Sequence, residues 1–323
     1  MKLSAIRPIA LVLSRELIIT VLLLLGVSFV VFVILFASPG DPFSVLLEDQ
    51  LFTAEAKAGV REAMGVPRSW HLQYLTWLAG MLSGNFGTSI RLGLPVLPEL
   101  LRVGLSTLIL TIGSLMITLL IAIPIALYSA VSGTNKASWP LTMSSYVISA
   151  LPVFWLGYIV IYFFTHQLGL FPMAFGFSSE GQKYRWLYQL LPIFVLGVGN
   201  GTISEVIRYL RQEMARVMAE DYIRLARAKG ASVWKHAFKE GLLIPVTEII
   251  ASKIPFILGG AVIVEQVFNW PGMGRMAWQA AQDRDYPVIM GIAILAAVFV
   301  RLGSLFQSVV YIMVNPRASK EYY

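Results

Sequence analysis

The sequence predicts an all-α integral membrane protein with six transmembrane helices, and its composition is the first reason. Of its 323 residues, 57% are hydrophobic and only 13% are charged, and the mean hydropathy is +0.72. A soluble domain of this length needs far more polar surface. The second reason is that six apolar runs are each long enough to cross a hydrocarbon core about 30 Å thick. Because lipid offers the backbone no hydrogen-bond partners, each run is expected to be an α-helix.

The six predicted spans lie at residues 17–37, 103–131, 141–165, 188–207, 242–268 and 287–314. The first has the basic flank of a signal peptide, because Lys2, Arg7 and Arg15 precede it. It is nevertheless about 21 residues long and ends without a small-x-small cleavage site. We therefore expect it to remain in the protein as a permanent helix.

The distribution of Lys and Arg predicts the orientation. If the N-terminus is inside, the inner segments hold 14 Lys and Arg in about 70 residues, whereas the outer segments hold nine in about 100. Both termini are therefore expected to be cytoplasmic. The net charge of +7 follows mostly from this bias and from attraction to anionic lipid, so no nucleic-acid partner is expected.

Within this single transmembrane domain, residues 1–323, the largest predicted segment outside the bilayer is the extracytoplasmic region 38–100. It opens with the turn Pro39-Gly40-Asp41-Pro42, and a helix at 54–64 is expected between the cap Thr53 and the stop Gly65. A second helix at 69–82 is rich in aromatic residues, which suits a layer on the membrane surface. So short a region cannot build its own core, so it is expected to pack on the spans.

The cytoplasmic loop 208–241 contains the most informative segment. Asp221 can cap a helix at 222–229, and Gly230 can stop it in the left-handed conformation. On a helical wheel, one face of this helix is apolar and consists of Tyr222, Ile223, Leu225 and Ala226. The opposite face is basic and consists of Arg224 and Arg227. Such a two-turn helix is too short to be stable alone, so a partner is expected to hold it.

A second short helix is expected in the same loop at residues 233–240. Ser232 can act as its N-cap and Gly241 as its stop. Two capped helices between hydrophobic spans are typical of a segment that docks into another protein.

No pattern in the sequence indicates catalysis, a metal or a bound nucleotide. There is no Gly-x-x-x-x-Gly-Lys-Ser/Thr phosphate cradle, no cysteine, and the three histidines lie in different segments. The run Gly272-Met273-Gly274-Arg275-Met276-Ala277 fits a dinucleotide fingerprint. It follows a membrane span rather than a strand of a βαβ unit, so we reject that interpretation.

Four charged residues fall inside the predicted fifth and sixth spans: Glu248, Lys253, Glu265 and Arg301. A charge at the centre of a membrane helix costs about 2.5–3.5 kcal/mol on insertion scales, so it usually faces a pathway or a partner charge. Glu248 and Glu265 lie near span ends, where they can also extend to the interface. Arg301 lies mid-span, which favours a pathway, a subunit interface or an ion pair.

The end of the fifth span reads Glu265-Gln266-Val267-Phe268-Asn269-Trp270-Pro271-Gly272-Met273-Gly274. Aromatic residues before a Pro-Gly turn are typical of anchoring at a membrane interface, which is the simplest physical interpretation.

Several motifs, in a fixed order, resemble the B-type permease subunit of the dipeptide/oligopeptide/nickel family of ATP-binding-cassette importers over nearly the whole chain. They are Pro39-Gly40-Asp41-Pro42, Gln73-Tyr74-x-x-Trp77, Gly84-x-Phe86-Gly87-x-Ser89, Thr107-Leu108, Asp221-Tyr222-Ile223-Arg224-x-Ala226-Arg227-Ala228-Lys229-Gly230, Glu265-x-Val267-Phe268-x-Trp270-Pro271-Gly272-x-Gly274, Asp285-Tyr286-Pro287-Val288 and Pro316-Arg317.

This resemblance implies a type I importer permease fold, in which six helices form half of a pore beside a homologous C-type permease. The implied ATPase-coupling residues are Asp221, Tyr222, Ile223, Arg224, Ala226, Arg227, Ala228, Lys229 and Gly230. The implied outer gate, facing a substrate-binding protein, is Glu265, Phe268, Trp270, Pro271, Gly272 and Gly274. ATP and Mg would be bound by two partner ATPase subunits, at a bacterial or archaeal cytoplasmic membrane. The implied cargo is peptide, with nickel, glutathione or opine-like solutes as alternatives.

The chain departs from the family pattern in two places. It is about three residues shorter between Gly230 and Pro245, and Ser304, Ser308 and Asn315 stand where the family carries Asn, Asp and Asp. A self-sufficient secondary carrier or channel is the alternative function, but its inverted repeats are not visible between residues 1–165 and 166–323. A membrane-bound scaffold or sensor would leave the intramembrane charges unexplained.

Overall fold

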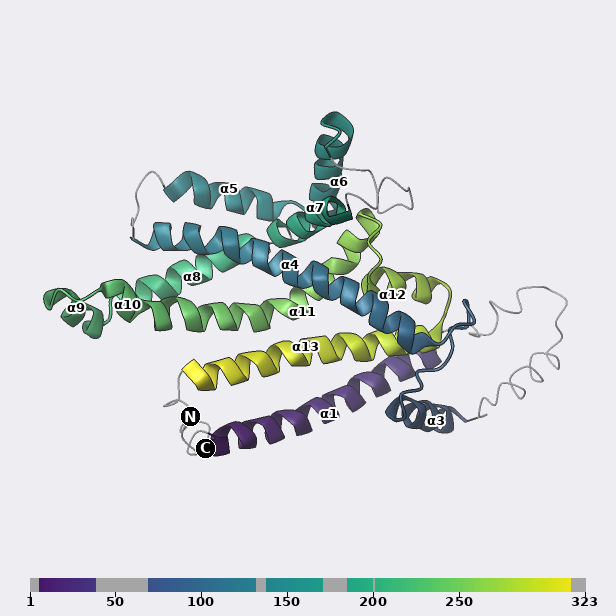
Figure 1. Ribbon diagram of the computed structural model, residues 1–323. Coiled ribbons are helices and arrows are strands. Elements are labelled where there is room, and N and C mark those ends of the chain that lie inside the picture. The colour runs from purple at the N-terminus through teal and green to yellow at the C-terminus, as the bar shows by residue number, and fades with distance from the viewer. Residues whose placement is uncertain (1–5, 39–68, 132–137, 171–184, 200, 315–323) are drawn as a thin grey trace, which may run out of the picture. The chain divides into compact units, whose positions relative to one another are not determined.

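The computed structural model describes residues 6–38, 69–131, 138–170, 185–199 and 201–314, and its regular structure over these ranges is helical (Figure 1). The α-helices are α1 (Ile6–Ala37), α3 (Trp70–Leu82), α4 (Val96–Val131), α5 (Ser138–Ala150), α6 (Val153–Ile161), α7 (Arg185–Val198), α8 (Thr202–Met218), α9 (Asp221–Ala228), α10 (Val233–Phe238), α11 (Ile244–Val267), α12 (Met273–Gln282) and α13 (Tyr286–Val314). Two π-helical turns, η3 (Tyr162–Gln167) and η4 (Lys239–Leu243), follow α6 and α10. The predicted turn at Pro39-Gly40-Asp41-Pro42, the predicted helix 54–64 and Asn315 lie outside the described residues.

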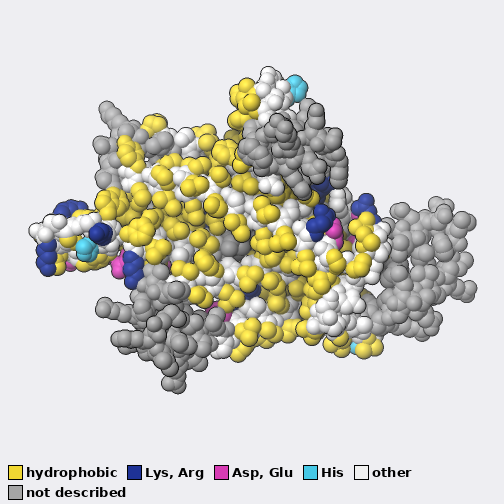
Figure 2. All heavy atoms as spheres, viewed as in Figure 1, with side chains coloured by type: hydrophobic (Ala, Val, Ile, Leu, Met, Phe, Trp, Pro, Cys, Tyr) yellow, Lys and Arg dark blue, Asp and Glu magenta, His cyan; other side chains and the backbone are white. Residues whose placement is uncertain are grey.

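The helices have the length and composition of membrane spans. Three of them contain apolar stretches long enough to cross a bilayer, at Ser14–Ala37, Val96–Ala130 and Tyr286–Val310, and two bent helix pairs would bring the number to five within the described residues. Hydrophobic side chains cover much of the visible face (Figure 2), and α1 exposes apolar side chains between Leu17 and Phe36. The prediction of an all-α, multi-span membrane protein is therefore confirmed.

The third predicted span, 141–165, is not one straight helix. α5 and α6 meet at an angle of 98°, with Leu151 and Pro152 between them. Pro152 has an extended backbone, with ψ at 135°. Proline offers no N–H to the helix and disfavours the α conformation of the residue before it, which explains a break at this position.

The fourth predicted span, 188–207, is also a bent pair. α7 and α8 meet at 53°, and Gly201 between them has a φ of +74°. α8 then continues to Met218, so residues 208–218, which were expected to begin the cytoplasmic loop, are helical. Long basic side chains such as those of Arg208, Arg211 and Arg216 can extend from a helix that continues past the predicted end of the span.

The chain divides into two compact units. One comprises residues 1–16, 108–270 and 300–323, and the other comprises residues 17–107 and 271–299. α1, α4 and α13 each contribute residues to both. We refer to them as the larger and the smaller unit and describe each separately.

The core of the larger unit forms where small residues let helices approach closely. A Cβ on Gly197 would lie 2.6 Å from the backbone oxygen of Ser114, and the Thr118 hydroxyl donates a hydrogen bond of 2.6 Å to the Gly197 carbonyl. A Cβ on Gly157 of α6 would lie 3.3 Å from the Phe268 ring. These contacts fix α4 against α7, and α6 against the end of α11.

The smaller unit is tied together by polar contacts at the loops. The Ser89 hydroxyl donates to the buried Asp285 carboxylate, and Arg91 Nη1 lies 2.5 Å from Asp283 Oδ2. The predicted helix 69–82 is confirmed as α3. It packs on α1, as expected, with the Tyr74 and Phe29 ring centroids 5.5 Å apart.

Candidate functional site

The start of α9 lies one residue earlier than predicted. Glu220 is the N-cap, with extended φ and ψ of −67° and 147°, and Asp221 is already the first helical residue. Asp221 Oδ1 lies 3.3 Å from Arg224 Nη1, one turn along the helix. The prediction that Asp221 is the cap was therefore wrong, although its charge still complements the positive end of the helix dipole.

α9 ends at Ala228, one residue before the predicted end, with Lys229 as its C-cap, and Gly230 is the left-handed stop that the sequence predicts. Gly230 has a φ of +68°, its N–H donates to the Arg227 carbonyl at 3.1 Å, and the Ala231 N–H donates to the Ala226 carbonyl at 2.9 Å. This pair of bonds is a Schellman motif, which requires the left-handed conformation that glycine adopts without strain.

One face of α9 is buried against the neighbouring helices of the larger unit. Ile223 and Ala226 are buried, and Ile223 joins a small hydrophobic cluster whose other buried members are Met214, Val217 and Ala237. The wheel placed Leu225 on the same apolar arc, but its side chain is 55% exposed. Two apolar residues thus hold the helix in place, and the remaining apolar surface is presented to solvent.

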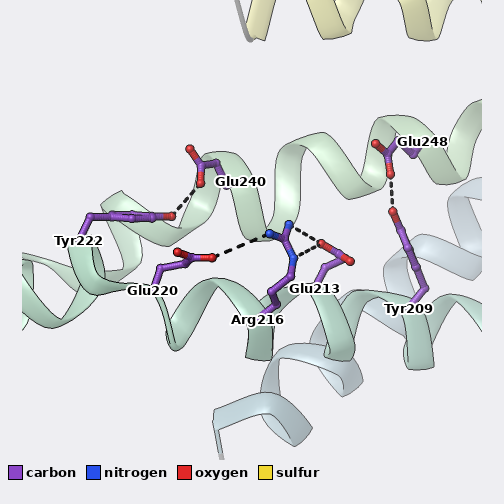
Figure 3. Close-up of polar contacts among 7 residues, drawn as sticks. All are labelled: Tyr209, Glu213, Arg216, Glu220, Tyr222, Glu240 and Glu248. Carbon is purple, nitrogen blue, oxygen red and sulfur yellow. Dashed lines mark hydrogen bonds and ion pairs between the residues drawn. The ribbon is translucent and has the colours of Figure 1, made fainter. Parts of the chain in front are cut away.

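Polar contacts also tie α9 to the helices on either side (Figure 3). The Tyr222 hydroxyl donates to Glu240 Oε2 at 3.0 Å. Arg216 on α8 pairs with Glu213 at 2.7 Å and reaches Glu220 at 4.0 Å. Burial, followed by the hydrogen bond to Glu240, raises the pKa of Tyr222 to about 12. The phenol is therefore a permanent donor near neutral pH.

The outer face of α9 and α10 combines exposed apolar and basic side chains. We call it the docking surface; it consists of Tyr222, Arg224, Leu225, Arg227, Lys229, Trp234 and Phe238. Lys and Arg side chains gather where α9 and α10 lie, at the shared end of α8 and α11 (Figures 1 and 2). Large apolar side chains exposed among charges are typical of a protein interface.

The second predicted helix of the loop does not stop at Gly241. α10 passes through the π-helical turn η4 directly into α11, so Val233–Val267 is helical without interruption. Gly241 is buried, and a Cβ there would lie 3.0 Å from the Met214 Sδ and Cε atoms. The glycine thus permits close packing rather than a stop, which corrects the prediction for 233–240.

The charged residues within the predicted spans have partners in the larger unit. Lys253 on α11 pairs with Glu205 on α8, with side chains 11% and 49% exposed. Glu248 accepts a hydrogen bond from the Tyr209 hydroxyl (Figure 3). Arg301 on α13 pairs with Glu16 on α1, with side chains 12% and 21% exposed. Of the roles considered for Arg301, an ion pair is thus present in the structure.

Sequence reasoning did not identify Glu205 and Glu16 as functional candidates. Glu205 lies inside the predicted fourth span, and Glu16 immediately precedes the first. Their signal was available, because buried charges in a membrane require partners of opposite sign. Matching each intramembrane cation to a carboxylate would have identified both.

The residues of the expected outer gate divide between the two units. In the larger unit, Glu265, Phe268 and Trp270 are buried, and the Trp270 side chain is only 1% exposed. Glu265 is therefore not extended to the interface, and Trp270 is a core residue rather than an interfacial anchor.

Pro271, Gly272 and Gly274 belong to the smaller unit. Gly272 is the N-cap of α12 and Gly274 is buried. The Thr107 hydroxyl oxygen accepts a hydrogen bond of 2.8 Å from the Met273 N–H, which fixes the start of this helix.

Among the described residues, no three His, Cys, Asp or Glu side chains lie close enough together to hold a metal ion. Lys253 with Glu205, Arg301 with Glu16, and Tyr209 with Glu248 instead form ion pairs or hydrogen bonds between helices.

Comparisons with known proteins agree with these features. The model of the family described as binding-protein-dependent transport system inner membrane component matches residues 122–320, and the model of its N-terminal part matches residues 9–95. The chain is 38% identical over 312 residues to the oligopeptide transport system permease protein AppB of Bacillus subtilis, covering 94% of this chain and 97% of that relative.

Two further relatives have similar coverage. The glutathione transport system permease protein GsiC of Salmonella paratyphi A is 34% identical, over 91% of this chain and 94% of its own length. The dipeptide transport system permease protein DppB of Alkalihalophilus pseudofirmus is 30% identical, over 94% and 97%. Because the family model matches residues 122–320 and AppB aligns with 94% of the chain, this chain belongs to the family of binding-protein-dependent transport system inner membrane components.

Proposed function

We propose that this chain is the pore-forming subunit of an ATP-driven, binding-protein-dependent importer of short peptides. The observation that supports the proposal is the docking surface. It lies on α9 and α10, a solvent-exposed helix pair that connects α8 to α11. The chain lacks a phosphate cradle of its own. The energy for transport therefore comes from a partner that binds this surface. Two ATPase subunits that bind ATP and Mg would supply it. The chain itself is then non-catalytic.

One such chain forms half of a pore, so the complete importer requires further subunits. A homologous C-type permease would supply the other half, and a substrate-binding protein would deliver solute to the outer side. The loop from Glu265 to Gly274 is the proposed outer gate. Because Glu265, Phe268 and Trp270 are buried, their proposed role is to hold the gate loop in place. The named specificities of the relatives, oligopeptide, dipeptide and glutathione, support a cargo that contains peptide bonds.

Six spans with both termini in the cytoplasm of a bacterium or archaeon are part of this proposal, and the sequence provides a convenient test. The chain has no cysteine, so single cysteines can be labelled without background. A membrane-impermeant maleimide should label Ser83→Cys from outside intact cells and Lys235→Cys only in inverted vesicles. Labelling of both from one side would refute the topology.

The function itself is tested in proteoliposomes that contain the whole complex. Peptide uptake should require ATP, and ATP hydrolysis should rise with the peptide-loaded binding protein. Uptake by this polypeptide alone without ATP would instead establish a secondary carrier or channel.

Three variants test the docking surface. Gly230→Pro cannot adopt a φ of +68°, and Ala226→Asp places a charge in a buried position. Leu225→Ala removes only exposed apolar surface. All three should insert into the membrane and lose ATP-coupled transport, whereas Ala219→Asp, exposed just before α9, should keep it. Normal transport in all three would refute the coupling role.

A further inference from the structure

A polar cavity lies within the larger unit, between α8, α11 and the part of α13 that belongs to this unit. Its volume is about 580 Å³, within the range of about 300–1,000 Å³ typical of small-molecule sites. The cavity is separate from the docking surface, which lies beyond the end of α8.

The polar lining repeats with helical spacing on all three elements. α8 contributes Glu205, Arg208, Tyr209 and Gln212, α11 contributes Glu248, Ser252 and Lys253, and α13 contributes Ser304 and Gln307. Residues three or four apart lie on one face of a helix, so each element presents a polar stripe to the same space. Polar stripes on membrane helices face water-filled cavities, because contact with lipid is costly.

The charges that line the cavity fall into two classes. Glu205 and Lys253 neutralise each other as an ion pair. Glu248 accepts a hydrogen bond from a neutral group, Tyr209, and the exposed Arg208 forms no ion pair within the described part of the chain. The cavity thus offers one carboxylate and one guanidinium that no opposite charge among the described residues neutralises.

The presence of both positive and negative side chains in the cavity indicates which kind of solute it can bind. A cation would meet Arg208 and Lys253, and an anion would meet Glu205 and Glu248, so either is opposed by charges of its own sign. A net-neutral solute with separated charges is complementary to both. Guanidinium groups bind carboxylates through two parallel hydrogen bonds, and the uncharged Gln and Ser groups can pair with amide groups.

We propose that this cavity is a transit site for zwitterionic peptides, in which Glu248 binds the ammonium group and Arg208 binds the carboxylate. The proposal rests on the function proposed above and names the residues that recognise the cargo within this chain. Arg208 and Glu248 are therefore specificity-determining residues, whereas Tyr209 positions the Glu248 carboxylate.

The experiment uses the reconstituted complex and three probes: dialanine, N-acetyl-dialanine without the ammonium group, and dialanine amide without the carboxylate. Uptake of each is measured at concentrations that saturate the same binding protein. The readout is the uptake ratio of dialanine to each blocked peptide, so the amount of active protein cancels within a variant.

Glu248→Gln should reduce the preference over N-acetyl-dialanine about tenfold or more and leave the preference over the amide unchanged, because the charge-assisted hydrogen bond to the ammonium group is lost. Arg208→Gln should do the opposite. Arg211→Gln, on the same helix but outside the cavity lining, should change neither ratio. Tyr209→Phe should weaken the first preference less than Glu248→Gln does, because the carboxylate remains.

Unchanged ratios in both cavity variants would overturn the transit site while leaving the importer function intact. If wild-type complex shows no ATP-dependent dialanine uptake, the proposed function fails as well. Should Glu248→Gln not assemble, the Arg208→Gln result decides alone, because that side chain is exposed and its loss leaves no buried group unpaired.

Discussion

At the scale of single residues, the Arg301–Glu16 ion pair shows how this membrane protein tolerates charge. Both side chains are mostly buried, and Arg301 also donates to the Glu16 backbone carbonyl at 3.4 Å. Removing a charge from water is costly, and the partner offsets that cost only while it is present. The pair therefore acts as a unit.

Replacing one member of the pair should therefore destabilise the protein more than replacing both members. We expect Arg301→Leu to destabilise the protein by about 3–5 kcal/mol, because it removes the guanidinium that pairs with the mostly buried Glu16 carboxylate. Combining it with Glu16→Gln should restore most of the stability. The apparent melting temperature of purified protein measures both effects, and Arg15→Leu at an exposed neighbouring position serves as the control. Equal losses in the single and double variants would contradict the coupling.

Tyr222 gives a prediction about pH. Its pKa is raised to about 12 by burial and by the hydrogen bond to Glu240, so the folded protein holds the phenolic proton more tightly than the unfolded chain does. The resulting stabilisation is fully present below about pH 10, the unfolded value, and is lost as pH rises through about 12.

The consequence is measurable well below the pKa of Tyr222. Tyr222→Phe should reduce the ratio of transport to ATP hydrolysis by the same factor at about pH 6.5 and about pH 9. A wild-type advantage that has already disappeared at the higher pH would show that the phenol ionises early and would contradict this contact.

At the scale of elements, the sequence predicts the presence of helices better than their breaks. Pro124 and Pro192 lie inside helices α4 and α7, whereas Pro152 separates α5 from α6 by 98°. Proline is therefore accommodated within a helix at two positions and breaks the helix at a third. Which outcome occurs depends on whether neighbouring helices support the distorted turn, and such packing is not local in the sequence.

The site shows the same division between local and distant contacts. Gly230 was predicted correctly because a left-handed helix stop depends on residues within one turn. The partner of Lys253 lies 48 residues away, on another helix. The charge of Glu205 marks it as a candidate partner for Lys253, but no periodicity within a single span shows which residues of two helices face each other. The cavity itself could therefore not be predicted.

Two glycines provide an element-scale test of helix packing. Gly197→Ala places a Cβ 2.6 Å from the Ser114 carbonyl oxygen, a contact with backbone that cannot move aside easily. We expect α7 to separate from α4 at a cost of about 1–3 kcal/mol. Gly26→Ala, with no atom within 4 Å of the new Cβ, should leave stability unchanged or raise it slightly. Thermal unfolding of both variants provides the comparison, and equal melting temperatures would refute the packing role.

At the scale of the whole molecule, the charge distribution distinguishes a purely apolar surface from a surface that is both apolar and basic. Large apolar side chains are exposed along α1, where lipid can cover them. On the docking surface, exposed apolar residues occur beside Arg224, Arg227 and Lys229. The second surface therefore suits a water-soluble partner with an acidic rim.

Binding of the ATPase subunits should depend on salt. Raising the ionic strength from about 0.1 M to about 1 M shortens the Debye length from about 10 Å to about 3 Å, which weakens the attraction between exposed charges. We expect the ATPase subunits to dissociate severalfold more readily at high salt, and Arg227→Gln should flatten this dependence. Light-scattering or pull-down measurements in detergent test it, and salt-independent binding would indicate a purely apolar contact.

The uninterrupted helix from Val233 to Val267 also has a mechanical consequence. It is a lever about 50 Å long, at a rise of 1.5 Å per residue. One end, with Trp234 and Phe238, is part of the docking surface, and Glu248 and Lys253 lie partway along the helix. A tilt of about 5° about its base would displace the far end by about 4 Å. A small rotation imposed by a partner would thus change the width of a passage lined by this helix, with no local unfolding between the two places.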